Sequence, residues 1–184
     1  MLKQNPISGT DANIISFFPL GLSQLQMVAD EIIDHLCSYR PEYSGIIHLQ
    51  RCAGTRVNEL FQPERWEVQS SSVVHLQPQK GNALRILNIS DIGFTDADAF
   101  NVVLSDMRRL SKRQYERAFA QCVQSAGLWR LYENGYLRPS THMLRHLRIK
   151  ELAALGWELP AIGTWVGEKN LDNLNYYLGS QYYL

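Results

Sequence analysis

The stretch that decides the fold is His142-Met143-Leu144-Arg145-His146, in the last quarter of the chain. Residues three and four positions apart share one face of a helix, so His142, Arg145 and His146 project together. Taken alone, this pattern is typical of a solvated polar helix face. A zinc site at the two histidines is another interpretation, but Met143 stands where a zinc protease carries its glutamate.

Helical signals dominate the rest of the chain. Capping-box spacing occurs in three pairs: Ser23 with Gln26, Thr95 with Asp98, and Ser111 with Gln114. Apolar periodicity predicts helices over residues 23–36, 43–52, 96–109 and 112–126. Later helices are predicted from a cap at Ser140 or Thr141 to Gly156, from Pro160 onward, and over 170–178.

Strand signals occupy the segment 66–89 instead. Apolar and β-branched residues occur at position 68, at 73–74 and over 84–89, and Lys80-Gly81-Asn82 between them is typical of a tight turn. We therefore expect an α+β fold that is mainly α, with a small antiparallel β-sheet.

The chain of 184 residues fits one domain, which we expect over residues 21–184 after a partly disordered lead-in at 1–20. A composition of 45% hydrophobic and 20% charged residues excludes an intrinsically disordered protein. The 18 Lys and Arg equal the 18 Asp and Glu, so net charge gives no indication of nucleic-acid binding. A local basic face would come from two clusters: Arg108, Arg109, Lys112, Arg113 and Arg117, and Arg138, Arg145, Arg148 and Lys150.

Cysteine usage and hydropathy bear on location. Cys37, Cys52 and Cys122 are odd in number and form no Cys-x-x-Cys, so neither a disulfide framework nor a zinc knuckle is indicated. The sequence has no apolar run of the length of a membrane span and no signal-peptide pattern. We expect core thiols in a soluble, cytoplasmic protein.

Three further elements carry groups suited to phosphate chemistry: Gly54-Thr55-Arg56 with Glu59, Lys80 at the tip of the predicted hairpin, and Tyr177 near the chain end. Gly54 breaks one predicted helix, and Arg56 starts a short one. Each element alone is typical of an ordinary surface arginine, a solvated turn lysine or a packing tyrosine. Tyr182 and Tyr183 belong to the packing class.

In this order and spacing, the elements resemble the catalytic domain of the tyrosine recombinases, the phage-integrase family. The resemblance covers about residues 23–178. It implies a catalytic set of Arg56, Lys80, His142, Arg145 and Tyr177, supported by Glu59, His146 and the position of Glu168. The apolar and glycine pattern over 152–156 and 162–167 is also similar to that of the family.

The resemblance implies a site-specific recombinase or integrase that cleaves and rejoins DNA through a 3′-phosphotyrosyl intermediate. Arg56 and Arg145 would clamp the non-bridging oxygens of the phosphate through paired, charge-assisted hydrogen bonds. Tyr177 would be the nucleophile and His142 its proton acceptor, while Lys80 would protonate the departing 5′ oxygen.

No metal or other cofactor is implied. The expected partners are double-stranded DNA and further copies of the chain in a DNA-bound tetramer, without a membrane, at the nucleoid in the cytoplasm. About 22 residues precede the first helix and seven follow Tyr177. We therefore expect a minimal family member or a fragment, without the family's N-terminal core-binding domain.

Glu168 departs from the family pattern, since a histidine or tryptophan usually occupies this position, nine residues before Tyr177. An ionised carboxylate donates no hydrogen bond to phosphate and repels it. The alternative interpretation is a catalytically degenerate relative that acts as a DNA-binding or recombination accessory protein. A helical interaction module with coincidental motifs is a third, and it would show no salt-dependent DNA affinity.

Overall fold

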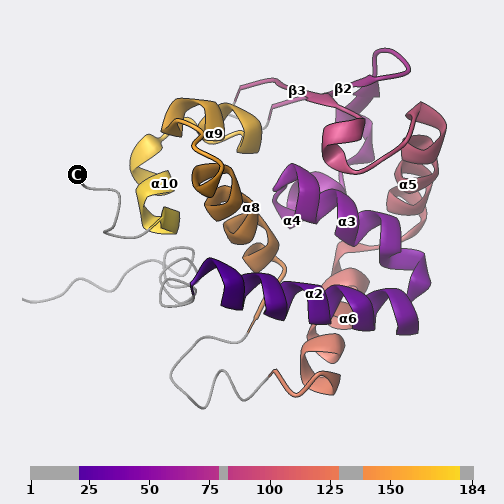
Figure 1. Cartoon of the computed structure of the whole chain (residues 1–184). Coiled ribbons are helices and arrows are strands. Elements are labelled where there is room, and N and C mark those ends of the chain that lie inside the picture. Colours follow the sequence, from indigo (N-terminus) through magenta and orange to yellow (C-terminus); the bar gives the residue numbers. More distant parts are fainter. Residues whose placement is uncertain (1–20, 79–82, 129–138, 179–184) are drawn as a thin grey trace, which may run out of the picture.

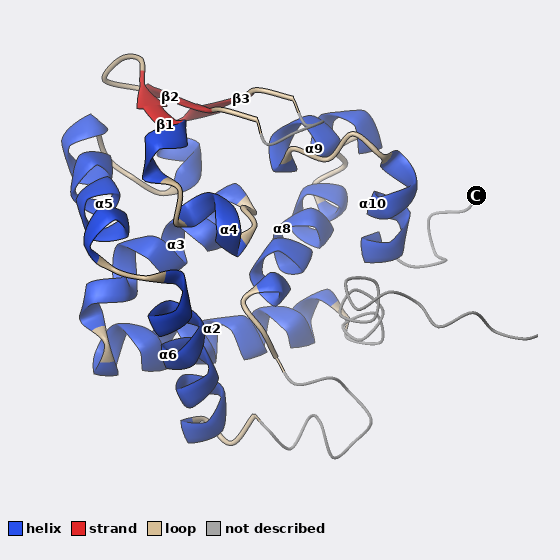
Figure 2. Ribbon diagram, turned by 180° about the vertical axis from the view of Figure 1, so that it is seen from behind, coloured by secondary structure: helices blue, strands red, loops and turns tan. Residues whose placement is uncertain are grey.

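A computed structural model describes residues 21–78, 83–128 and 139–178. Helices make up most of this part, and a small sheet lies at one edge of it (Figure 1). Figure 2 shows the same arrangement from behind, with the three strands above the helices. The predicted fold class is confirmed. The lead-in at 1–20 and the turn with Lys80 lie outside the described residues, as do Arg138, Tyr182 and Tyr183.

The elements before the sheet are α2 (Leu22–Tyr39), a 3-10 turn (Pro41–Tyr43), α3 (Ser44–Ala53), α4 (Val57–Leu60) and a second 3-10 turn (Pro63–Arg65). The sheet comprises β1 (Trp66–Val68), β2 (Val73–Leu76) and β3 (Arg85–Asn88), and a third 3-10 turn (Ser90–Ile92) follows it. The remaining helices are α5 (Ala97–Arg109), α6 (Lys112–Ser125), α8 (His142–Ala154), α9 (Leu159–Val166) and α10 (Leu171–Leu178).

The sheet is antiparallel, in the order β1-β2-β3. Trp66 lies opposite Leu76, and Val74 lies opposite Leu87, and all four side chains are buried. Because side chains alternate along a strand, this register turns one face of the sheet toward the helices. The Trp66 indole Nε1 also donates to the Glu59 carbonyl at 2.9 Å, which anchors the sheet to α4.

Helix α8 joins two hydrophobic cores. Its first turns, with Leu144 and Leu147, belong to the main core, which also contains the buried face of α2. Its later turns, with Leu152, pack against Ile162 of α9 and Leu174 of α10 in a smaller core. The smaller core fixes α10 against α8, so the helix that carries Tyr177 is placed by apolar packing.

Gln50 ties three segments together in the interior. Its amide Nε2 donates to the Thr55 carbonyl at 3.4 Å and to the Thr141 carbonyl at 3.1 Å. Its Oε1 accepts from the Tyr115 hydroxyl of α6 at 2.7 Å. Gln50 is fully buried, so these bonds replace the water that its amide has lost. They hold the loop before Arg56 beside the start of α8.

Two predicted caps are wrong by one or two residues. Helix α5 is capped by Asp96, whose carboxylate accepts from the Ala99 amide at 2.9 Å, rather than by Thr95. Helix α2 begins at Leu22, where the Gln24 side chain accepts from the Gly21 amide at 3.2 Å, so Ser23 lies inside its first turn. The spacing rule allows adjacent polar residues to compete for each cap, and tertiary packing selects among them.

The predicted core thiols are confirmed only for Cys122, because Cys37 and Cys52 are half-buried. All three cysteines are free. Within the ranges that the structure describes, no helix combines the length and apolarity that crossing a membrane requires.

Replacing Tyr115 by phenylalanine tests the buried Gln50 bonds. We expect Tyr115→Phe to lower the free energy of unfolding by about 1–3 kcal/mol, because the buried Gln50 Oε1 loses its hydroxyl donor. Denaturant unfolding measures the change. The matched control is Tyr39→Phe, since Tyr39 is 69% exposed and should change stability by less than about 0.5 kcal/mol. Equal effects of the two substitutions would contradict the role given to Gln50.

Candidate active site

Arg145 lies fully buried on the first turn of α8, where three segments meet. Its Nη1 donates to the Gly54 carbonyl at 2.8 Å and to the Val166 carbonyl at 2.5 Å. These bonds join the turn between α3 and α4 to the end of α9. The other terminal nitrogen, Nη2, makes no hydrogen bond with the described residues, so it is free to donate to an anion.

Arg56 is placed by the glycine turn that precedes it. Gly54 has φ +61°, in the left-handed region, and a Cβ there would lie 3.2 Å from atoms of Arg148 and Val166. The turn ends α3 and makes Arg56 the first flanking residue of α4. The Glu59 carboxylate then accepts from the Arg56 backbone amide at 2.7 Å and lies 3.6 Å from its guanidinium. Glu59 thus contacts both the backbone and the side chain of Arg56, the residue that the resemblance implies it supports.

The two guanidinium groups converge on one carboxylate, that of Glu168. Glu168 Oε2 accepts from Arg56 Nη2 at 2.6 Å and lies 3.8 Å from Arg145 Nη2. Arg56 and Arg145 therefore form a clamp of the size of an oxyanion, and we call this pair the arginine clamp. Gly167, directly before Glu168, has φ +68°, and its lack of a Cβ leaves room for the side chain of Arg85, which a Cβ would approach to 2.9 Å.

Tyr177 lies beside His142, within hydrogen-bond distance. The Tyr177 hydroxyl is 2.9 Å from His142 Nε2, and the tyrosine side chain is 3% exposed. His146 packs edge-on against the same tyrosine ring, with ring centroids 5.2 Å apart. His142 and His146 therefore contact the tyrosine side chain from successive turns of α8, on the one helix face that their i and i+4 spacing predicted.

Burial among cations keeps both histidines neutral. Burial, together with the charges of Arg145 and Arg56, lowers the pKa of His142 to about 4. Burial, Lys150 and His142 lower the pKa of His146 to about 3, against a hydrogen bond that His146 donates to the backbone of Tyr177, which raises it. A neutral imidazole has one lone pair, so His142 Nε2 can accept the phenol proton near pH 7.

Arg85 is a third arginine at the site, and the sequence analysis missed it. It is buried on β3, its Nη2 donates to the Ala53 carbonyl, and its Nη1 lies 3.6 Å from the Glu59 carboxylate. Burial lowers its pKa to about 9, and Glu59 opposes that shift. Strand alternation could have identified it. Arg85 and Leu87 lie two positions apart in a strand that was predicted, so their side chains point to the same face of the sheet.

The described part of the site brings together six of the residues inferred from sequence: Arg56, Glu59, His142, Arg145, His146 and Tyr177, with Glu168 in contact with both arginines. The position of Lys80 lies outside the described residues. Among the described side chains, no group of three His, Cys, Asp or Glu gathers as a metal site.

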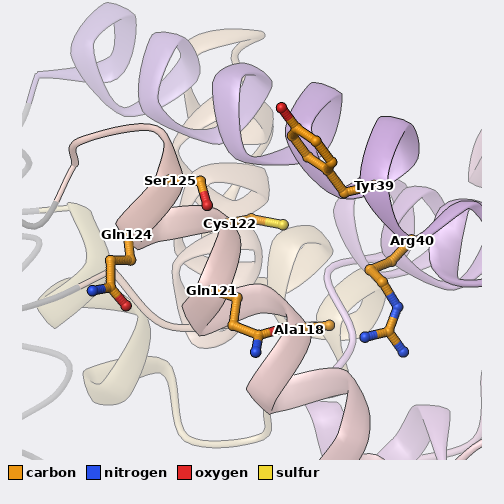
Figure 3. Close-up of a pocket in the computed structure, with 7 residues that line it drawn as sticks. All are labelled: Tyr39, Arg40, Ala118, Gln121, Cys122, Gln124 and Ser125. Carbon is orange, nitrogen blue, oxygen red and sulfur yellow. The ribbon is translucent and has the colours of Figure 1, made fainter.

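A hollow of about 510 Å³ lies between the end of α2 and α6 and shares no lining residue with the arginine clamp (Figure 3). Its lining includes Arg40, which pairs with Glu42 at 2.7 Å, and Cys122, whose pKa burial raises. Neither an activated nucleophile nor a ligand set lines it. We assign it no function.

No protein-family model and no curated protein matches the sequence. Solved structures do match. A crystal structure of XerA recombinase matches with a TM-score of 0.62 and 16% identity, over 97% of this chain and 62% of that chain. A lambda integrase dimer bound to a COC′ core site matches with a TM-score of 0.62 and 16% identity, over 85% of this chain and 47% of that one.

XerH recombinase in its pre-cleavage complex with difH matches with a TM-score of 0.58 and 16% identity, over 88% of this chain and 50% of that chain. All three proteins are tyrosine recombinases. The chain thus has the fold of the tyrosine-recombinase catalytic domain, which confirms the resemblance at the level of fold. It spans from 47% to 62% of the length of these three chains.

The depressed histidine pKa values predict a pH-dependent stability. Between pH 6.5 and about 4, the unfolded chain binds a proton at His142 that the folded chain does not, so the free energy of unfolding falls as pH falls. For His142 the loss is at most about 3 kcal/mol. Denaturant unfolding of wild type and His142→Gln at pH 7, 5.5 and 4 measures this. The difference between their free energies of unfolding should shrink toward low pH.

The control for this comparison is His48→Gln, because His48 is exposed on α3. Its stability curve should run parallel to that of the wild type across the same pH range. If the His142→Gln curve also runs parallel to the wild type, His142 does not titrate as its surroundings indicate.

Proposed function

We propose that this chain is the catalytic domain of a site-specific DNA recombinase or integrase that cleaves and rejoins strands through a 3′-phosphotyrosyl intermediate. The observation that carries the proposal is the convergence of Arg56 and Arg145 on one carboxylate oxygen, at 2.6 and 3.8 Å. That convergence supplies paired donors for one oxyanion. The second support is the 2.9 Å contact between the Tyr177 hydroxyl and His142 Nε2, the proposed nucleophile and its proposed proton acceptor.

In the proposed reaction, the Tyr177 oxygen attacks the scissile phosphorus while the phenol proton passes to His142 Nε2. The P–O5′ bond breaks as the Tyr177–phosphorus bond forms, and the charge that develops on the non-bridging oxygens is stabilised by the arginine clamp. The low pKa of His142, which burial and then the charges of Arg145 and Arg56 cause, keeps its imidazole neutral near pH 7, so the ring can accept this proton.

The departing 5′ oxygen needs a proton, and we assign this step to Lys80 on the resemblance alone. Strand exchange is the reverse reaction, in which a 5′ hydroxyl of another strand attacks the phosphotyrosine. Glu59 orients Arg56 through its backbone amide and side chain, and Arg85 balances the Glu59 charge from the opposite side. The protein groups in these steps require no metal ion.

Double-stranded DNA is the proposed substrate, bound by a tetramer of chains at the nucleoid. Exposed arginines at the junction of α5 and α6, Arg109 and Arg113 among them, offer phosphate contacts although the whole chain is neutral. Lys112 of this cluster donates to the Asn58 side chain at 2.6 Å, two positions beyond Arg56. The cluster therefore begins beside the arginine clamp.

A second candidate function is that of a catalytically degenerate relative, which binds DNA or another recombinase without cutting. The observation that favours it is the contact of Glu168 with both arginines of the clamp. The proposed cleavage reaction needs these same arginines to bind the phosphate. Salt-dependent DNA binding without covalent chemistry would distinguish this function from the first.

A covalent trap tests the enzymatic proposal. The chain is incubated with nicked duplexes of randomised sequence, in which cleavage near the nick releases a short fragment and leaves the protein attached. We expect an adduct that resists denaturant, with the phosphate on Tyr177 in the peptide mass spectrum and with a common sequence at the attached DNA end. Arg56→Lys should slow adduct formation by about 10²–10³-fold, because lysine lacks the bidentate fork.

Tyr177→Phe should form no adduct, whereas Tyr39→Phe, which changes a distant exposed phenol, should form it at the wild-type rate. An adduct on Tyr177→Phe would refute the assigned nucleophile. Absence of any wild-type adduct, with DNA binding retained, would instead support the degenerate relative.

A further inference from the structure

Four contacts hold the Glu168 carboxylate in the arginine clamp. Oε2 contacts Arg56 Nη2 at 2.6 Å and Arg145 Nη2 at 3.8 Å. Oε1 accepts from the Asn170 backbone amide at 3.3 Å and from the Asn173 side chain at 3.4 Å. The carboxylate thus takes the Arg56 donor that an oxyanion would use and lies within ion-pair distance of the Arg145 donor, and it does so from within the same chain.

The two carboxylates of the site are not equivalent. Glu59 has a side chain 4% exposed and lies between Arg56 and Arg85, so it is a fixed part of the interior. Glu168 has a side chain 11% exposed and contacts Arg56 and Arg145 from the more open side of the site. With three arginines and these two carboxylates, the site carries one net positive charge. A phosphodiester that takes the place of Glu168 in the clamp leaves this net charge unchanged.

We propose that Glu168 is an internal anion that occupies the arginine clamp, and that a phosphate binds there by displacing its side chain. The identity of the phosphate as a DNA phosphodiester rests on the proposed function. A carboxylate and a phosphodiester are both monoanions that bind the same guanidinium groups, and two anions held in one clamp repel each other. Occupancy of the clamp by Glu168 therefore lowers its affinity for phosphate.

The displacement requires only a change of side-chain torsions. The Glu168 backbone amide donates to the Gly163 carbonyl at 2.7 Å, which keeps the main chain at the end of α9 in place. Beside it lies a hollow of about 260 Å³, lined in part by Thr164, Gly167 and Lys169 as well as by Glu168 itself. The hollow can receive the carboxylate, and the Lys169 ammonium is chemically suited to bind it there.

The exchange also reaches the helix that carries Tyr177. Asn173 lies in the first turn of α10, and Asn170 directly precedes the helix. The Asn173 side chain and the Asn170 backbone amide both donate to Glu168 Oε1. When Glu168 leaves the clamp, both bonds are lost and the first turn of α10 is released from the arginines. Phosphate binding is thereby coupled to the freedom of the tyrosine helix.

The test measures binding of inorganic phosphate by calorimetric titration of the whole chain at constant ionic strength. We expect Glu168→Gln to bind phosphate about tenfold to a hundredfold more tightly than wild type, because the competing charge is removed while the side-chain shape is kept. The matched control is Glu31→Gln, an exposed residue of α2 that undergoes the same change of charge and should leave the affinity unchanged.

The gain in phosphate affinity must depend on the arginine clamp. The double variant Arg56→Gln with Glu168→Gln should therefore lose this gain in affinity. If the Gln variant does not fold, Glu168→Asp keeps the charge but withdraws it by one methylene, and it should show a smaller gain. Equal phosphate affinity of the wild type and the folded Glu168 variants would overturn the proposal, as would a gain that survives the loss of Arg56.

The nicked-duplex assay separates this proposal from the proposed function. Glu168→Gln should also form the Tyr177 adduct about tenfold faster or more. Tighter phosphate binding without any adduct in either protein would support the internal anion and contradict the enzyme. An adduct that forms equally fast in both proteins, with equal phosphate affinity, would support the enzyme and refute the internal anion.

Discussion

The buried guanidinium of Arg145 is the constraint on which the rest of the structure depends. An isolated charge in a protein interior is costly unless it is hydrogen-bonded and paired. Here Nη1 bonds the carbonyls of Gly54 and Val166, and Glu168 lies 3.8 Å from Nη2. Three segments distant in sequence must meet around this one side chain to satisfy it. The Nη1 side of the guanidinium binds carbonyls and holds the three segments together, and the Nη2 side faces the anion site.

The same concentration of positive charge determines the chemistry of the neighbouring groups. Burial and then the charges of Arg145 and Arg56 depress the pKa of His142, and burial and then Arg56 lower the pKa of Arg145. The site thus stores unfavourable electrostatic energy, which a bound anion relieves. Glu168 relieves part of it within the chain. A residue that departs from the family pattern thereby stabilises the free protein and competes with its proposed ligand.

Much of this molecule could be predicted because the deciding signals are local. Helix periodicity, the turn at Gly54 and the His142 to His146 spacing placed the main elements and the histidine face correctly. The misplaced caps at Ser23 and Thr95 arose where several polar residues satisfied the same spacing rule. Arg85 was missed because a single charged residue in a strand is ordinarily exposed, and only its tertiary partners make an inward position tolerable.

The sequence by itself determined the class of fold, the order of the motifs and the chemical types available for phosphate chemistry, since these follow from residue identity and short-range spacing. Only the tertiary structure decided that Arg56 and Arg145 contact the same carboxylate oxygen, that Arg85 is buried against Glu59, and that Tyr177 touches His142. The reason is physical: contacts between residues far apart in the chain depend on how buried faces pack, and no local pattern encodes the distance between two side chains.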